Sequence, residues 1–184
     1  MLIKDENRKK NASQMLANME DLGFVSNSTG IENEIEILQS RLLLRDVVKD
    51  LKVYTEYRSD GRILDPIIYQ TQPVNVDLDP VHLDSLDINL LEKTQWLNLR
   101  LTRQDTTYII KGSVMNGKRE EEAINRKATS LPAVFTTAIG TVTLTINPGQ
   151  KWPEGVAYMV TLRPPMEVAT EYLSRLSISP TSKL

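Results

Sequence analysis

The segment from Gly112 to Arg119, GSVMNGKR, has the glycine and lysine spacing of a phosphate-binding loop. Such a loop cradles phosphates with backbone N–H groups and needs Ser or Thr after the lysine to hold magnesium. Arg119 stands at that position instead. In addition, Asn116-Gly117 lies between two strand-like segments, where Asn-Gly is the strongest short-range signal for a hairpin turn. The segment is therefore predicted to be a type I′ hairpin turn and not a nucleotide site.

A second group of chemically active side chains gathers around Pro80. It contains four aspartates and the only histidine, namely Asp77, Asp79, His82, Asp84 and Asp87. Clustered carboxylates can hold calcium, but the spacing of an EF-hand and the glycine at its bend are absent. Catalysis by His82 is not supported either. The chain has no cysteine to act as a nucleophile beside the histidine, and it lacks the G-x-S-x-G elbow that carries the serine of many Ser-His-Asp hydrolases. We predict a solvated acidic loop, with no catalytic residue, no metal site and no cofactor.

Aromatic side chains are the third possible source of binding chemistry, because their flat faces can stack on sugar rings. Trp152, in the turn-like segment PGQKWPEG, and Tyr69 are the candidate glycan contacts. Trp96 lies at the edge of an alternating segment, which favours core packing. Aromatic residues make up only 5% of the chain, a small share for a dedicated carbohydrate-binding module.

Composition narrows the class of protein. The 184 residues can bury a sizeable core, and the net charge of -2 comes without any basic block that could neutralise nucleic-acid phosphates. The absence of cysteine excludes disulfide scaffolds and Cys-ligated zinc. No apolar run approaches the ~20 residues that a membrane-spanning helix needs. The N-terminal segment also lacks the apolar stretch of a signal peptide.

The segment from Ile31 to Leu51, IENEIEILQSRLLLRDVVKDL, is predicted to form one long amphipathic helix. Its apolar residues recur with helical spacing, which is typical of packing against a core. Its charged stripe consists of Arg41, Arg45 and Lys49. These cations are candidate subunit contacts to Asp46 and Asp50 of a neighbouring copy, and the alternative is a solvated helix face.

The rest of the chain has mainly the period of strands. Alternation or strand-like composition predicts strands near 52–57, 74–78, 97–101, 107–114, 141–146 and 156–162. Short helices are expected over 14–22 and after Pro164-Pro165, where Pro165 suits the first helical turn. Strands are expected at Leu2–Ile3 and after Arg175, and both look like cut ends of a larger protein. Because helices and strands are segregated along the chain, the class is α+β.

This order predicts an architecture of three parts. Residues 1–52 and 163–184 would form an α/β base contributed by both chain ends. Residues 53–162 would form an inserted antiparallel β-rich module, either a small sandwich or a barrel.

Several stretches resemble the Wzz-type chain-length determinants, the polysaccharide co-polymerases of bacterial export, and most closely the branch fused to a tyrosine autokinase. They cover most of the chain: LIKDE, NEIEILQSR with VVKDL, LKVYTEYRSDGR, PIIYQTQPVNV, LPAVFTTAIGTVTLT and PPMEVATEYLSRLSISPTSK. These stretches are hydrophobic patterns and contain no catalytic signature.

The resemblance implies a piece of a periplasmic domain, anchored at the bacterial inner membrane by flanking spans that this sequence lacks. The parent would regulate the chain length and export of capsular or exopolysaccharide, and would assemble as a ring beside a polymerase and the growing glycan. A cytoplasmic ATP-dependent tyrosine kinase domain would belong to the parent and not to this chain. Two alternatives remain open: an extracytoplasmic glycan-binding module without a scaffold role, and a hydrolase with two carboxylates converging in a cleft.

Overall fold

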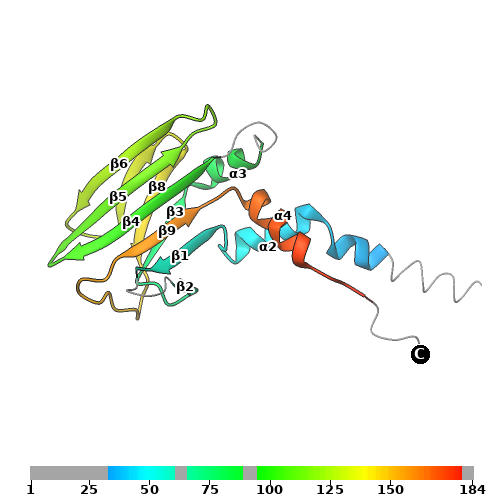
Figure 1. Ribbon diagram of the computed structural model, residues 1–184, viewed down its shortest axis with the longest axis horizontal. Coiled ribbons are helices and arrows are strands. Elements are labelled where there is room, and N and C mark those ends of the chain that lie inside the picture. The colour runs from blue at the N-terminus through cyan, green and yellow to red at the C-terminus, as the bar shows by residue number, and fades with distance from the viewer. Residues whose placement is uncertain (1–32, 61–65, 89–94, 180–184) are drawn as a thin grey trace, which may run out of the picture.

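A computed structural model describes residues 33–60, 66–88 and 95–179. The elements expected over 2–3 and 14–22 lie outside these ranges. In chain order the elements are α2 (Arg41–Asp50), β1 (Thr55–Ser59), β2 (Ile67–Ile68), β3 (Val74–Leu78), α3 (Pro80–Ile88), β4 (Trp96–Gln104), β5 (Thr107–Met115), β6 (Glu121–Ala128), β7 (Ala133–Thr137), β8 (Gly140–Ile146), β9 (Tyr158–Leu162) and α4 (Pro165–Arg175). Figure 1 shows α2 and α4 at one end of the molecule and the strands at the other, with α3 beside the sheets.

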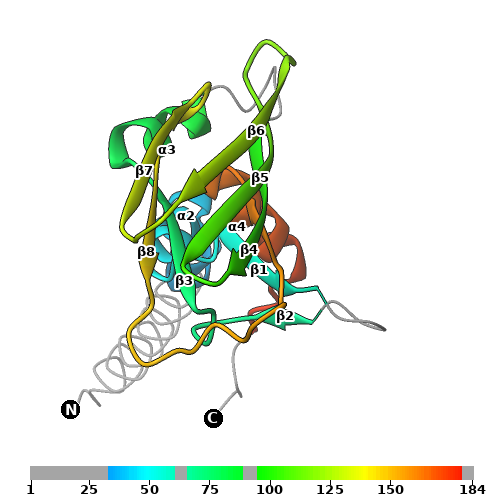
Figure 2. The same ribbon diagram turned by 90° about the vertical axis from the view of Figure 1, so that its left-hand side faces the viewer.

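The strands form two antiparallel sheets. The larger has the order β2-β1-β9-β4-β5-β6, and the smaller has the order β3-β8-β7. Every strand pair described is antiparallel, from the long β4–β5 hairpin to the pairing of β1 with β9 at the two ends of the β-rich segment. The α+β class is therefore confirmed. In Figure 2 the smaller sheet faces the larger one, as two layers.

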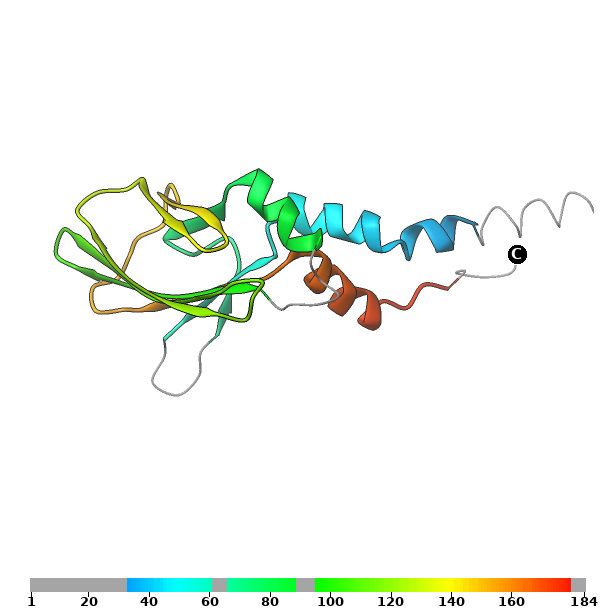
Figure 3. The ribbon, with the colours of Figure 1, turned by 90° about the horizontal axis from the view of Figure 1, so that it is seen from above.

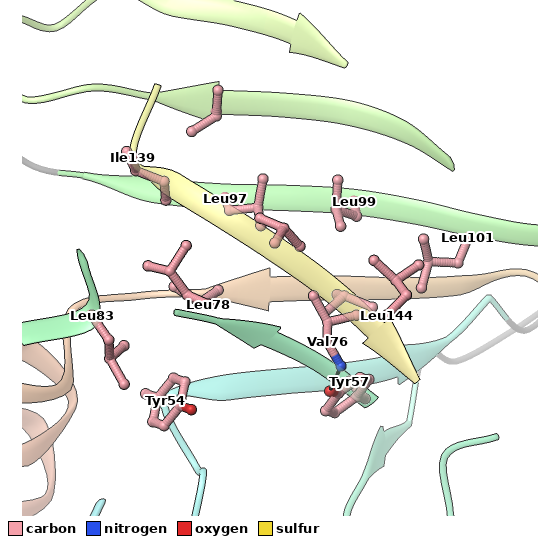
Figure 4. Packing of buried hydrophobic residues seen from close by; sticks show 14 of the residues in the cluster. Tyr54, Tyr57, Val76, Leu78, Leu83, Leu97, Leu99, Leu101, Ile139 and Leu144 are labelled. Atoms are coloured by element: carbon pink, nitrogen blue, oxygen red, sulfur yellow. Dashed lines mark hydrogen bonds between the residues drawn. The ribbon is translucent and has the colours of Figure 1, made fainter. Parts of the chain in front are cut away.

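The main core lies between the two sheets because alternate residues of each strand point inward. Leu97, Leu99 and Leu101 from β4 are almost completely buried, and Val76 from β3 and Leu144 from β8 meet them from the opposite sheet (Figure 4). The strict period of two in these strands is the reason that the sequence predicts them well.

The two sheets are also joined by a hydrogen bond. The backbone N–H of Val76 donates to the hydroxyl oxygen of Tyr57 over 2.7 Å, and the bond is buried (Figure 4). Since β3 is an edge strand of its sheet, this amide faces away from β8 and has no strand neighbour on that side. The Tyr57 hydroxyl from β1 thus satisfies a polar group that burial would otherwise leave unpaired. Burial raises the pKa of Tyr57, so the phenol stays protonated at neutral pH.

Replacing Tyr57 with phenylalanine should therefore destabilise the fold by about 1–3 kcal/mol, because the Val76 amide loses its acceptor but stays buried. Urea unfolding followed by circular dichroism measures this change. Tyr172→Phe, at an exposed position on α4, is the matched control and should stay within about 0.5 kcal/mol of the unsubstituted chain. Equal stabilities of the two variants would contradict the inter-sheet role of Tyr57.

At the other end of the molecule, α2 packs beside α4 (Figure 3). The two helices come from opposite ends of the described chain. The described segments before α2 and after α4 extend on the side away from the sandwich, so the described part of the chain begins and ends on the same side (Figure 1).

The single helix predicted from Ile31 to Leu51 is wrong in one respect, because the helix is interrupted. Residues 33–38 are helical, and Ser40 then adopts an extended conformation with ψ of 126° before α2 begins at Arg41. The Ser40 carbonyl still accepts the first hydrogen bond of α2, from the Leu44 N–H over 3.1 Å. Ser40 is thus the N-cap residue of a new helix, and polar Gln39-Ser40 was the signal for it.

The acidic loop predicted around Pro80 is also wrong, because Pro80–Ile88 forms the helix α3. Asp79 caps it: its Oδ1 accepts a hydrogen bond from the His82 N–H over 3.1 Å, and Pro80 occupies the first helical position. Asp79 Oδ2 accepts a second bond from the Thr141 N–H over 2.9 Å, which attaches the cap to β8. Hydrogen bonds from the His82 side chain and from Thr141 lower the pKa of Asp79 to about 2, so the cap is ionised at neutral pH.

Two smaller predictions also need correction. A turn does join β5 to β6 at Asn116-Gly117, but it is not type I′, because the positive φ of 61° falls on Arg119. Asn116 Oδ1 accepts hydrogen bonds from the backbone N–H groups of Lys118 and Glu120. The strand expected after Arg175 is absent from the described part of this segment, residues 176–179.

Candidate functional site at the α2–α4 groove

An apolar groove of about 670 Å³ lies between α2, the β1–β2 edge and α4. Its walls are mainly aliphatic and aromatic. They comprise Leu44, Val47 and Val48 of α2 with its C-cap Leu51, Val53, Ile67, Ile68 and Tyr69 near the β1–β2 edge, and Tyr172 of α4 with its C-cap Leu176. This volume lies within the range of ligand and peptide pockets.

The apolar face of α2 is mostly open to solvent, contrary to the core packing that its periodicity favours. Val48 is fully buried and Leu44 is partly buried, so these two residues attach the helix to the fold. By contrast, Val47 is 42% exposed and Leu51 is 52% exposed, and both line the groove. Single exposed apolar residues are ordinary, but a contiguous apolar face beside a groove is typical of an interaction surface.

The charged stripe of α2 is partly engaged within the chain. Arg45 donates to Asp46 through Nε at 3.0 Å and through a terminal nitrogen at 2.8 Å. The hydrogen bond to Asp46 is the main cause that raises the pKa of Arg45. Lys49 forms an ion pair with Asp84 of α3. Arg41 and Asp50 are exposed on the same helix. The proposed contacts of this stripe with a neighbouring copy stay a prediction.

One rim of the groove is charged. Arg163, just before α4, donates to Glu171 over 3.0 Å, and Glu171 also accepts a hydrogen bond from Arg175 over 2.6 Å. Arg163 and Arg175 both line the groove, with Glu56 of β1. The site therefore has an apolar floor and a rim of partly exposed ion pairs, which is the usual arrangement of a protein interface.

The aspartates near Pro80 do not converge. Asp77 pairs with Lys52 over 2.7 Å, Asp79 caps α3 and Asp84 pairs with Lys49. Asp87 Oδ1 accepts a hydrogen bond from the Met166 N–H over 2.8 Å, which caps α4. Desolvation raises the pKa of Asp87. Within the described ranges, no three acidic or histidine side chains come together as a metal site.

The two predicted glycan contacts lie apart. Tyr69 lines the groove beside α2, whereas Trp152 lies in the segment between β8 and β9, at the sandwich end far from the helices (Figure 1). Trp152 lines two hollows there, of about 260 and 400 Å³. Its neighbours Arg103 and Tyr108 were missed, although they face each other across the β4–β5 hairpin. Trp96 is partly buried at the start of β4.

The groove residues of β2 and α4 were also missed. The only signal for them was the short apolar run Ile67-Ile68-Tyr69, because a sequence pattern does not show which apolar residues remain uncovered after folding.

No helix in the described ranges is both long enough and apolar enough to cross a membrane. In comparisons with known proteins, the chain matches no family model, no curated protein and no solved structure.

Proposed function

We propose that this chain is a non-catalytic, periplasmic scaffold domain of an inner-membrane polysaccharide co-polymerase, which regulates the length and export of a capsular or exopolysaccharide. The parent would carry flanking membrane spans, which place the domain at the periplasmic face, and a cytoplasmic tyrosine autokinase domain. Copies of the domain would associate in a ring, next to the polymerase and the growing glycan. The resemblance of several stretches to the Wzz-type family supports this reading.

The observation that carries the proposal is the uncovered apolar face of α2 beside the groove. Val47 and Leu51 leave apolar surface in water, which is unfavourable by about 25 cal/mol per Å² until a partner covers it. A second copy is the occupant that a scaffold requires, because ring assembly gives each subunit a neighbour on either side. The Arg163 and Arg175 rim would surround this contact.

The arrangement of the elements is consistent with anchoring at both ends. In an inserted architecture, residues 1–52 and 163–184 form a base from which the module 53–162 projects. The packing of α2 against α4, with the sandwich at the opposite end, suits such a base (Figure 3). A domain held by two spans needs its chain to enter and leave on one side, and the described residues before α2 and after α4 extend on the side away from the sandwich (Figure 1).

The test is photo-cross-linking of the full-length protein in cell membranes. Benzoylphenylalanine at Leu51 should give an adduct of twice the subunit mass, because that position is 52% exposed and lines the groove that a neighbouring copy would cover. The control is the same group at Val134 on β7, which is 63% exposed but lies on the sandwich, and it should give no such adduct. Adducts from neither position, or from Leu51 to an unrelated protein alone, would reject the scaffold contact.

The second candidate function is glycan binding without a scaffold role. It is favoured by the aromatic cluster at Trp152 and by the two hollows beside it. In that case the Leu51 position should give no dimer adduct, while the isolated chain should bind oligosaccharide.

A further inference from the structure

We propose that the 400 Å³ hollow beside Trp152 binds an anionic sugar residue of a polysaccharide, such as a uronic acid. The assignment of the ligand to a glycan rests on the proposed function, whereas the preference for an anion rests on the residues of the hollow. These residues are Pro73, Arg103, Tyr108, Leu131, Ile146, Gln150, Lys151 and Trp152.

Trp152 is held in a fixed orientation. Its indole Nε1 donates to the Val156 carbonyl oxygen over 3.0 Å. Its ring meets Tyr158 edge to face, with centroids 5.3 Å apart and planes at 88°, and it meets Tyr108 at 5.7 Å and 58°. The indole N–H is already hydrogen-bonded, and the ring packs against two tyrosine rings. The side chain therefore loses little conformational entropy when a ligand binds. The partly exposed indole then offers apolar surface to the C–H groups of a sugar ring.

Two cations stand beside this aromatic surface. The Arg103 guanidinium lies 5.8 Å from the centroid of the Tyr108 ring, and its Nε donates to the Asp105 carbonyl oxygen over 2.9 Å. These two contacts orient the guanidinium, whose remaining N–H groups can donate to a carboxylate in pairs. Lys151 is exposed next to Trp152 and supplies the second positive charge.

The lining of this hollow contains no carboxylate, which distinguishes it from the hollow next to it. The neighbouring hollow, of about 260 Å³, shares Arg103 and Trp152 but adds Asp105 and Glu154. Carboxylate oxygens accept hydrogen bonds from sugar hydroxyl groups and repel an acidic sugar. The larger hollow therefore favours an acidic sugar residue. The smaller hollow would then hold a neutral sugar residue of the same polysaccharide.

The test is titration of the 184-residue chain with hyaluronan tetrasaccharide, which contains glucuronate, and with neutral chitotetraose, followed by NMR. The chain has two tryptophans, so two indole N–H signals are expected, and Trp152→Phe assigns them. Hyaluronan tetrasaccharide should shift the Trp152 signal and leave the Trp96 signal in place. Chitotetraose should bind at least about tenfold more weakly, as expected for the loss of one charge-assisted contact.

Arg103→Gln and Lys151→Gln should each weaken binding of the acidic tetrasaccharide about tenfold. Lys111→Gln on β5, an exposed cation outside the hollow, is the matched control and should leave binding unchanged. The proposal is overturned if no shift occurs, if both tetrasaccharides bind equally, or if free glucuronate or inorganic phosphate binds as tightly as the tetrasaccharide. Failure of binding together with Leu51 adducts would reject only this sugar site, whereas binding without adducts would reject only the scaffold.

Discussion

Replacing Gly112 with alanine should unfold the centre of the larger sheet. Gly112 lies opposite Leu99 in the β4–β5 pair, and a Cβ atom added there would lie 1.9 Å from the Asn98 carbonyl oxygen and 2.9 Å from the Leu99 Cα. Both contacts are with backbone atoms, so no flexible side chain can move away. The strands must separate locally, and hydrogen bonds and the burial of neighbouring leucines are lost with them. We expect a loss of more than about 3 kcal/mol in the free energy of unfolding.

Urea unfolding measures this loss, and Ser113→Ala is the control. Ser113 is the next residue of β5, lies opposite Asn98 and already carries a Cβ atom, so its substitution should cost less than about 1 kcal/mol. A loss of more than about 3 kcal/mol is a large fraction of the ~5–15 kcal/mol that stabilises most domains, and Gly112→Ala should therefore fold poorly or not at all. Equal urea midpoints for the two variants would show that the strands accommodate the added Cβ atom without loss of stability.

Gly112 also illustrates which features the sequence could predict. Its spacing from Gly117 and Lys118 resembled a phosphate-binding loop, yet the alternation on either side favoured a hairpin, and Gly112 lies inside β5. The strands that line the core on one face were predictable because burial of that face imposes a period of two on them. Segments such as Val74–Leu78 were located to the residue for this reason. The strands β2, β6 and β7 were missed, and β6 shows why: Ile124 is its only buried residue, so no alternation marks it.

The helices were harder to predict, because their limits depend on single polar residues. Asp79-Pro80 has the chemistry of an N-cap and a first helical residue, but the surrounding aspartates made the segment look like a loop. Ser40 interrupts a pattern whose apolar spacing continues across the break, so periodicity alone could not reveal it. At α3 the bond from the Thr141 N–H to Asp79, which attaches the cap to β8, also joins residues distant in sequence.

The candidate site was predictable only in part, for a related reason. The amphipathic character of α2 is evident in the sequence, but amphipathicity does not show what covers the apolar face. Val48 and Leu51 belong to the same pattern, yet one is buried and the other is half exposed. The difference arises from α4 and the β1–β2 edge, which cover only part of the helix and leave the groove open.

Replacing Val47 with aspartate should abolish assembly of the full-length protein without unfolding the domain. Val47 lines the groove and is 42% exposed, so a carboxylate at this position stays hydrated in the separate subunit. In the assembled state a neighbouring copy would cover it, and burying an unpaired carboxylate costs about 3 kcal/mol or more, a weakening of each contact by about a hundredfold. Leu51→Asp, in the same groove, should have the same effect.

Light scattering of the detergent-solubilised full-length protein measures the assembled mass, and circular dichroism of the 184-residue chain measures folding. Val134→Asp is the matched control: Val134 is equally apolar and lies on β7, an edge strand, where charged residues are well tolerated. This variant should keep the assembled mass, while Val47→Asp and Leu51→Asp should reduce it to that of one subunit and should release control of polysaccharide length in cells. Because the three variants carry the same added charge, assembly that survives in all of them would exclude the α2 groove as the subunit contact.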